Sequence, residues 1–195
     1  MLIRLYGDGA CWTIPQLRSE PHTYDVPTPS GIQGALESVY WKPEMRWVIQ
    51  TIFVLAPIKR ATMRVNHVEK PAAKTGQDVT KVRTQRRITY LRDVDYLIEA
   101  RVAGDDPGKH LNIAQRRLER GQWYRRPYLG MAEFPAHVEL STEGTKPIDD
   151  TRSLGLMFWG YDWTVKTPKP RYFNAQMERG VIHVPGIQET LELAA

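Results

Sequence analysis

The chain has a single cysteine, Cys11, among its 195 residues, which excludes an intramolecular disulfide framework and a zinc site built from cysteines. It also lacks any apolar run that approaches the roughly 20 residues of a membrane-spanning helix. Residues 1–6 alternate as in a strand and lack the long apolar stretch of a secretory signal peptide. We therefore expect a folded protein of the reducing cytoplasm that has no membrane partner.

Several motifs of cofactor-dependent enzymes are missing as well. There is no G-x-x-x-x-G-K-S/T phosphate loop, and Gly7-x-Gly9 is followed by Trp12 where the dinucleotide fingerprint needs a third glycine. The sequence has no H-E-x-x-H pair, no cluster of His, Cys and Asp, and no G-x-S-x-G elbow. We therefore predict that any chemistry proceeds without a metal and without an organic cofactor.

Positive charge is present and unevenly distributed. The chain contains 27 Lys and Arg against 22 Asp and Glu, a net charge of +5. Residues 58–92 hold ten basic and two acidic residues, and residues 101–126 hold seven basic and three acidic residues. Two basic segments that flank one strand are the electrostatic footprint expected for a polyphosphate ligand such as a nucleic acid. The alternative is a solvated basic surface with no such partner.

Residue patterns predict two helices and a set of strands. Ser30 and Gln33 fit a capping box at the start of a helix that Pro43 ends. A long basic hairpin is expected over residues 58–92, and a turn at residues 7–9. The remaining period-two patterns predict strands at residues 1–6, 45–57, 94–103, 134–140, 154–163, 170–178 and 181–184.

The order of these elements predicts the fold class. Without the basic hairpin, residues 1–140 follow the order strand, helix, strand, strand, helix, strand. This order is typical of the split βαβ, ferredoxin-like (RRM-like) α+β fold, in which two helices back a four-stranded antiparallel sheet. RNA-recognition modules use the same framework. We expect this domain over residues 1–145, with its hairpin at about 58–92, and a small β-rich C-terminal lobe over residues 150–195.

The start of the second helix carries the most informative group of residues. Asp106 and Pro107 predict a cap and a first-turn proline, which would leave the next three backbone N–H groups free to bind an anion. Lys109 adds a positive charge there, and His110 can transfer a proton near neutral pH. A phosphodiester would meet a charge stabiliser and an acid–base residue together. The alternative is a solvated Lys109 beside a His110 that only touches the core.

Tyr40 lies at the end of the first helix and is followed by Trp41 and Lys42. In a split βαβ fold both helices pack on one face of the sheet, so the end of one helix can approach the start of the other. The phenol of Tyr40 would then reach a phosphate held near Lys109 and His110. The alternative is that Tyr40 and Trp41 anchor the helix end in the core and its rim.

Eight stretches, in order along nearly the whole chain, carry a family resemblance. The two most specific are YWKP at residues 40–43 and GKH at residues 108–110. The full set is residues 5–12, 26–30, 38–43, 54–58, 90–96, 108–113, 128–134 and 175–182. With these stretches the chain resembles the subtype I-C CRISPR-associated repeat-RNA endonucleases, the variant-d members of the fifth Cas protein family in the RAMP superfamily.

The resemblance implies a fold and an activity. Members of the family have a ferredoxin-like N-terminal domain, a protruding basic β-hairpin and a C-terminal β-sheet. They cleave the CRISPR repeat RNA (pre-crRNA) at the base of its stem-loop without a metal, leaving a 2′,3′-cyclic phosphate. They then stay on the crRNA 5′ handle inside the type I-C surveillance complex, beside its other subunits. The family's active-site tyrosine, lysine and histidine correspond to Tyr40, Lys109 and His110.

We accordingly expect Lys109 to stabilise charge on the phosphate and His110 and Tyr40 to share the general base and general acid roles, in an order left open. We further expect RNA contacts from one aromatic and eight basic residues. These are Trp41, Lys42, Arg60, Arg64, Lys81, Arg83, Arg86, Arg87 and Arg116. Two alternatives remain: a non-catalytic subunit that caps the crRNA 5′ handle, and a ribosomal or RRM-type RNA binder unrelated to CRISPR.

Overall fold

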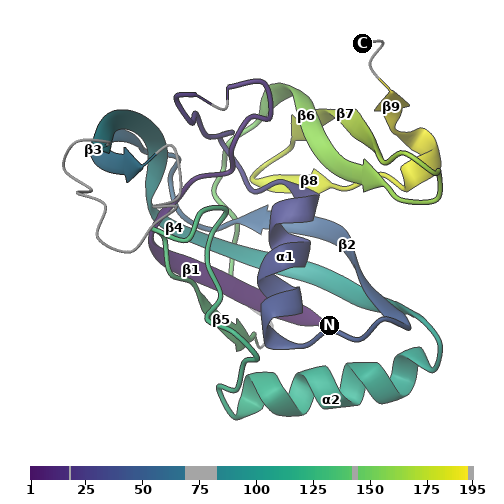
Figure 1. The fold of residues 1–195 in the computed structure, drawn as a ribbon. Helices are drawn as coiled ribbons and strands as arrows, with labels where there is room; N and C mark the ends of the chain where they lie inside the picture. Colours follow the sequence, from purple (N-terminus) through teal and green to yellow (C-terminus); the bar gives the residue numbers. More distant parts are fainter. Residues whose placement is uncertain (18, 69–82, 142–144, 193–195) are drawn as a thin grey trace, which may run out of the picture.

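The computed structural model describes residues 1–17, 19–68, 83–141 and 145–192, and it confirms a mixed α+β protein built on antiparallel sheets (Figure 1). The two helices are α1 (Pro29–Val39) and α2 (Pro107–Glu119). The strands are β1 (Leu2–Ala10), β2 (Met45–Val54), β3 (Arg60–Val68), β4 (Arg83–Gly104), β5 (His137–Leu140), β6 (Arg152–Asp162), β7 (Lys169–Met177), β8 (Val181–His183) and β9 (Leu191–Glu192). A short 3-10 helix, η2, covers Ile187–Glu189.

The larger sheet has the strand order β5-β1-β4-β2-β8, with β3 also paired to β4. All of its pairings between named strands are antiparallel. Helix α1 crosses in front of this sheet and α2 runs along its lower border (Figure 1). The inward-facing side chains of β1, β2, β4 and both helices join one hydrophobic core. The C-terminal residues contribute β8 to this sheet and otherwise form the separate sheet β6-β7-β9.

The second strand of the predicted hairpin and the predicted strand over residues 94–103 are parts of one strand. β4 is 22 residues long; its first part pairs with β3 and its later part with β2. Asp93 takes a positive φ of 53° where the strand passes from one partner to the other. The backbone N–H of Arg92 donates to the carbonyl of Lys59 at 2.8 Å, which fastens the start of the hairpin there. The expected hairpin tip lies outside the described residues.

The predicted turn at residues 7–9 is wrong, because β1 continues through both glycines to Ala10. Gly7 pairs with Val94 and Gly9 with Arg92 in the ladder between β1 and β4. A Cβ on Gly9 would lie 2.7 Å from the ring of Phe134. These glycines therefore allow a neighbouring segment to pack closely against the strand, and such close approach is a common reason for glycine inside a strand.

Helix α1 starts earlier than its predicted capping box. Thr28, rather than Ser30, is the N-cap, and its Oγ1 accepts a hydrogen bond from the backbone N–H of Gly31 at 3.1 Å. Pro29 occupies the first helical position, where its missing N–H costs nothing. Gln33 donates to Glu37 instead of reaching back to the cap. The helix ends at Val39, before Pro43. Among the described residues, no helix is long and apolar enough to cross a membrane.

Candidate active site

Tyr40 is the C-cap of α1, and its extended backbone is fixed on both sides. Its N–H donates to the carbonyl of Leu36 at 3.1 Å, and its carbonyl accepts from the indole Nε1 of Trp47 at 3.0 Å. The side chain turns into the protein and is only 4% exposed. Two backbone hydrogen bonds and burial of the side chain therefore fix the position of the phenol.

His110 is placed by the turn between β4 and α2. Asp106 and Pro107 cap and open α2 as predicted, and His110 follows in the first helical turn. Gly104 has a φ of 120°, and a Cβ there would lie 2.1 Å from the carbonyl oxygen of Glu44, so only glycine fits. The N–H of Asp105 donates to that same carbonyl at 3.0 Å. The start of α2 is thereby fastened to the segment that follows Tyr40.

The two helix ends meet in a buried hydrogen bond. The Tyr40 Oη lies 2.8 Å from Nδ1 of His110, although 70 positions separate the two residues in the sequence. Their ring centroids are 5.9 Å apart, and His110 is 4% exposed, as Tyr40 is. The phenol can donate to an unprotonated Nδ1 or accept from Nδ1–H, depending on the tautomer of the imidazole. Either arrangement fixes the ring and leaves Nε2 on its other side.

Two residues that the sequence analysis missed flank this pair. Oε1 of Glu44 lies 3.9 Å from Nε2 of His110. On the other side, Cζ of Arg117 lies 5.4 Å from the ring centroid of Tyr40, and Nη1 of Arg117 donates to the carbonyl of Val39 at 2.9 Å. Arg117 is two helical turns after His110 and so lies on the same face of α2. This spacing could have identified Arg117 from the sequence.

The surroundings of Tyr40 raise the pKa of its phenol. Burial makes the largest contribution, because it disfavours the phenolate, and the negative charge of Glu44 acts in the same direction. The positive charge of Arg117 opposes both effects. Tyr40 is therefore a neutral phenol throughout the physiological pH range. Across the described part of the chain, no group of three or more His, Cys, Asp and Glu side chains lies together in a way that could hold a metal ion.

The backbone N–H groups at the start of α2 are less free than the sequence predicts. Asp106 adopts a left-handed conformation, with a φ of 44°, and turns its carboxylate toward its own helix. Its Oδ1 accepts from the N–H of Lys109 at 3.2 Å, and its carbonyl accepts from the N–H of His110 at 3.3 Å. The protein's own cap thus uses two of the three N–H groups that the sequence analysis left for a phosphate.

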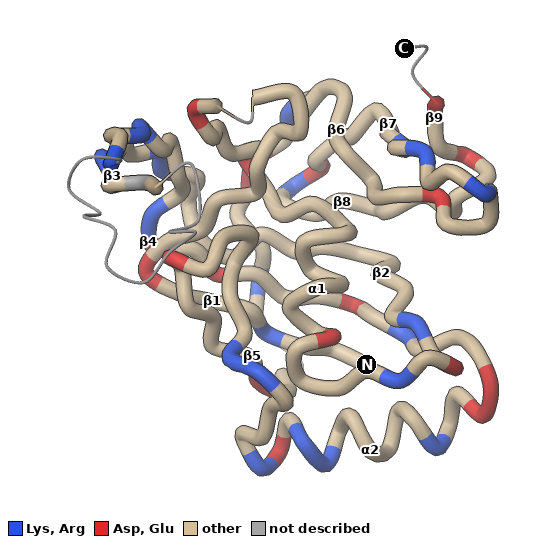
Figure 2. Tube along the Cα trace, viewed as in Figure 1, with Lys and Arg blue, Asp and Glu red and all other residues tan. Residues whose placement is uncertain are grey.

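Other predicted site residues near α1 and α2 lie on the surface. Lys109 precedes His110 and is exposed, as are Trp41, Lys42 and Arg116. Trp41 is 51% exposed although it directly follows the buried Tyr40. Lys and Arg are spaced along α2 and gather again on β3 and the start of β4 (Figure 2). The structure therefore brings Tyr40 and His110 together and leaves Lys109 and Arg116 exposed on α2.

The predicted RNA-binding arginines of the hairpin form a separate group, away from α2 (Figures 1 and 2). Arg64 and Arg87 are exposed and directly opposite each other in the β3–β4 register. Arg60 is held by Asp25, with its Nε 2.8 Å from Oδ1, and Nε of Arg86 donates to the carbonyl of Ser19 at 3.1 Å. Arg83 is exposed, and Lys81 lies outside the described residues.

Comparison with known proteins identifies the family. The family model Cas_Cas5d, described as CRISPR-associated protein (Cas_Cas5), matches residues 1–185. The chain is 34% identical over 211 aligned positions to a protein of Mannheimia succiniciproducens, covering 94% of this chain and 93% of the relative. It is 37% identical over 207 positions to a protein of Thermus thermophilus, covering 94% and 90%. Both relatives are named CRISPR pre-crRNA endoribonuclease Cas5d.

Solved structures agree on the fold. A crystal structure titled as a CRISPR-associated protein aligns with a TM-score of 0.73 at 22% identity, covering 97% of this chain and 93% of that one. A functionally uncharacterised protein of Streptococcus mutans aligns with a TM-score of 0.72 at 23% identity over the same shares. The family match over nearly the whole sequence and the two relatives above 30% identity lead to one conclusion: the chain belongs to the Cas5d family of CRISPR-associated proteins.

Proposed function

We propose that this chain is a metal-independent endoribonuclease that cleaves CRISPR repeat RNA at the base of its stem-loop. The observation that carries the proposal is the buried contact between Tyr40 Oη and His110 Nδ1 at 2.8 Å, with exposed Lys109 beside it. A phenol, an imidazole and an ammonium group are the means for proton transfer and charge stabilisation at a phosphodiester. The names of the two curated relatives support the same substrate class.

The reaction would use the RNA's own nucleophile. The ribose 2′-oxygen attacks the neighbouring phosphorus, a new 2′-O–P bond forms, and the P–O5′ bond breaks. The products are a 2′,3′-cyclic phosphate and a 5′-hydroxyl end. The protein must align the 2′-OH with the leaving oxygen, accept the proton of the 2′-OH, give a proton to O5′ and stabilise the phosphorane between them.

The geometry supports distinct roles for the two ring nitrogens of His110. Because Tyr40 occupies Nδ1, Nε2 is the nitrogen left to exchange a proton with the RNA. Solvent also reaches His110 from the Nε2 side. The imidazole itself is only 5% exposed, but the Glu44 side chain next to Nε2 is 44% exposed. We assign to Nε2 of His110 the acceptance of the 2′-OH proton, with the proton for O5′ coming from solvent water, and assign to Tyr40 the orientation of the imidazole through Nδ1.

Electrostatics explain the need for Lys109. The carboxylate of Glu44 lies beside the His110 ring, and that of Asp106 accepts from the backbone N–H of Lys109. Each of these negative charges would repel an incoming phosphate. The ammonium group of Lys109 is exposed and can offset that repulsion, and it would stabilise the additional charge of the phosphorane. We therefore assign to Lys109 the stabilisation of the negative charge that develops in the transition state.

The wider proposal concerns how the RNA is held. The order β5-β1-β4-β2, with α1 and α2 in the connections, supports a ferredoxin-like domain over residues 1–145, and the sheet β6-β7-β9 supports a small C-terminal lobe. The arginines of β3 and β4 would bind backbone phosphates. After cleavage the protein would remain on the crRNA 5′ handle as a subunit of a type I-C surveillance complex.

The test uses repeat RNA and the same RNA with a single 2′-deoxy substitution at the scissile nucleotide. We expect the unmodified RNA to be cut in EDTA, and the deoxy RNA to bind with nearly unchanged affinity and remain intact, because phosphate contacts carry most of the affinity. Cutting of the deoxy RNA, or a strict requirement for Mg²⁺, would refute the mechanism. Binding of both RNAs without cleavage would favour the alternative of a non-catalytic cap on the 5′ handle.

A further inference from the structure

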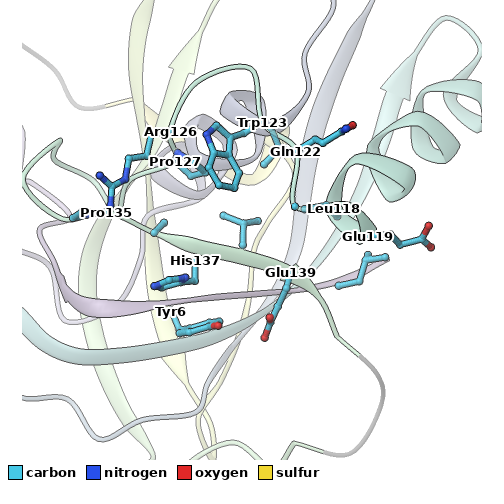
Figure 3. Close-up of a pocket in the computed structure, with 15 residues that line it drawn as sticks. Tyr6, Leu118, Glu119, Gln122, Trp123, Arg126, Pro127, Pro135, His137 and Glu139 are labelled. Atoms are coloured by element: carbon cyan, nitrogen blue, oxygen red, sulfur yellow. The ribbon is translucent and has the colours of Figure 1, made fainter.

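A pocket with a volume of about 750 Å³ lies along the free edge of the larger sheet (Figure 3). On one side of β5 it is lined by Trp123 and Arg126, from the segment that follows α2, and on the other side by Tyr6 and His137. Tyr6 and His137 stack with ring centroids 4.9 Å apart. The volume falls within the range of about 300–1,000 Å³ that small-ligand sites occupy.

The segment beside this pocket exposes more aromatic surface than packing explains. Trp123 is 55% exposed and Tyr124 is 85% exposed, although aromatic side chains normally contribute most of their area to a core or an interface. Arg125 and Arg126 follow directly and are exposed as well. Exposed aromatic rings interleaved with arginines are the side chains that proteins use to stack unpaired bases and hold their phosphates.

Hydrogen bonds connect this segment to the proposed active site. The backbone N–H groups of Tyr124 and Arg125 donate to the carbonyl of Ser38 at 2.9 and 3.2 Å. Ser38 is two residues before Tyr40, and Val39, which lies between them, lines the pocket. A group bound in the pocket would therefore be held at a fixed position relative to the Tyr40–His110 pair.

The charges around the pocket distinguish a base from a phosphate. Glu119 and Glu139, which line it, disfavour a phosphate there, although Oε1 of Glu119 accepts from Gln115 at 3.0 Å and Oε1 of Glu139 lies 3.6 Å from Nη1 of Arg4. Leu118 and Val138 supply apolar surface for a ring. The guanidinium of Arg126 lies at the margin of the pocket, on the Trp123 side (Figure 3).

We propose that this pocket binds one unpaired nucleobase of the RNA substrate next to the cleavage site. The base stacks on Trp123 inside the pocket, and its phosphate lies outside, on Arg126. This inference rests on the proposed function, since it requires an RNA substrate, but it concerns binding and not the chemical step. It assigns the residues after α2 the task of fixing the RNA relative to His110.

The test compares Trp123→Ala with Trp123→Phe and with a matched control, Trp163→Ala. Trp163 is 75% exposed and lies in the turn between β6 and β7, so its removal deletes a more accessible indole elsewhere. We expect Trp123→Ala to weaken binding of repeat RNA roughly 5- to 150-fold, the range for losing one stacked base. Trp123→Phe keeps an aromatic face and should bind nearly as the wild type does, and Trp163→Ala should be unchanged.

A second set of measurements identifies the base. Repeat RNAs with one abasic site at each unpaired position beside the stem are bound to the wild type and to Trp123→Ala. One abasic position should weaken wild-type binding by the factor that Trp123→Ala shows, with no further loss in the variant. Wild-type binding by Trp123→Ala, or equal additional losses at every abasic position, would overturn the proposal.

Two other outcomes separate this inference from neighbouring ideas. If Trp123→Ala binds RNA normally but no longer joins other subunits, the free edge of β5 is a protein interface and the nucleobase pocket is wrong. If the wild type binds repeat RNA but does not cut it, the proposed catalytic function fails, while the binding difference between Trp123→Ala and Trp163→Ala still decides the pocket.

Discussion

The Tyr40–His110 pair and the β3–β4 hairpin differ in almost every physical respect. Tyr40 and His110 are 4% exposed each and joined by a 2.8 Å hydrogen bond. Arg64, Arg83 and Arg87 of the hairpin are exposed on a two-stranded extension of the larger sheet in which β3 pairs with β4. The pair depends on a contact between residues far apart in sequence, whereas Arg64 and Arg87 are placed by the register of their own two strands.

This difference indicates how the two regions would divide the work. A reacting group must be held in one geometry before the substrate arrives, and burial with fixed hydrogen bonds provides that. Phosphate binding relies on charge and counterion release, which tolerate flexible and exposed side chains. We therefore expect changes at the pair to alter the rate of cleavage of bound RNA, and changes at the hairpin to alter affinity and its salt dependence.

The largest effect is expected from His110→Ala. Removal of the residue that exchanges protons with the RNA should lower the cleavage rate of saturated enzyme by about 10²- to 10⁴-fold. The affinity for repeat RNA should change little, because the exposed arginines remain. Single-turnover cleavage and equilibrium binding measure the two quantities separately. A parallel loss of rate and affinity would contradict the division between pair and hairpin.

His110→Asn provides the control for folding, because His110 is buried and its removal leaves the Tyr40 hydroxyl without its partner. An unsatisfied buried hydroxyl costs about 1–3 kcal/mol. The asparagine amide can still bond to Tyr40 near the position of Nδ1, but it lacks Nε2 and cannot titrate. We expect His110→Asn to melt close to the wild type and to remain as inactive as His110→Ala.

The next largest effect is expected from Lys109→Ala. Because its side chain is exposed, the substitution should leave the melting temperature unchanged. The cleavage rate should fall by roughly 10²- to 10³-fold, as when one electrostatic stabiliser of a transition state is removed. Lys109→Arg, which keeps the charge, should restore part of the rate. Near-normal cleavage by Lys109→Ala would show that another group stabilises the phosphorane.

A smaller effect is expected from Tyr40→Phe, which deletes only the hydroxyl. If Tyr40 orients His110, the loss is that of one neutral hydrogen bond worth about 0.5–1.5 kcal/mol, or up to about tenfold in rate. If Tyr40 itself transfers a proton, the loss should reach the range expected for His110→Ala. The measured ratio of the two rates therefore decides between a positioning and a proton-transfer role.

Much of the Tyr40–His110 contact could be predicted from the sequence, because the element order brings the end of one helix to the start of the other. The supporting contacts could not. Glu44 approaches His110 because of the tight turn at Gly104, and a glycine's φ is not visible in a sequence. Asp106 was correctly predicted as the cap, but the N–H groups after it were wrongly expected to be free, since its left-handed conformation directs its carboxylate back to Lys109.

The larger errors in the fold have local causes. Gly7 and Gly9 indicated a turn, but both are ladder positions that allow close packing of residues 134–135. The hairpin and the next strand could not be recognised as one strand, because the bend at Asp93 is again a matter of backbone conformation. β8 pairs with β2 across a long sequence separation, and a three-residue strand carries too little pattern to predict its partner.

The smallest effect on cleavage, and the sharpest test of the hairpin, is expected from Arg64→Ala combined with Arg87→Ala. These exposed arginines face each other across the strands, and two like charges in that position are unfavourable without an anion between them. Removing both should reduce the slope of log affinity against log salt by about 1.5, the value for two phosphate contacts. The cleavage rate of saturated enzyme should stay at the wild-type level. Arg60→Ala is the matched control, because Asp25 already neutralises that guanidinium, and its salt slope should change less. An unchanged slope in the double variant would mean that this part of the hairpin faces solvent or a protein. The proposal that the hairpin supplies the affinity for RNA would then be wrong.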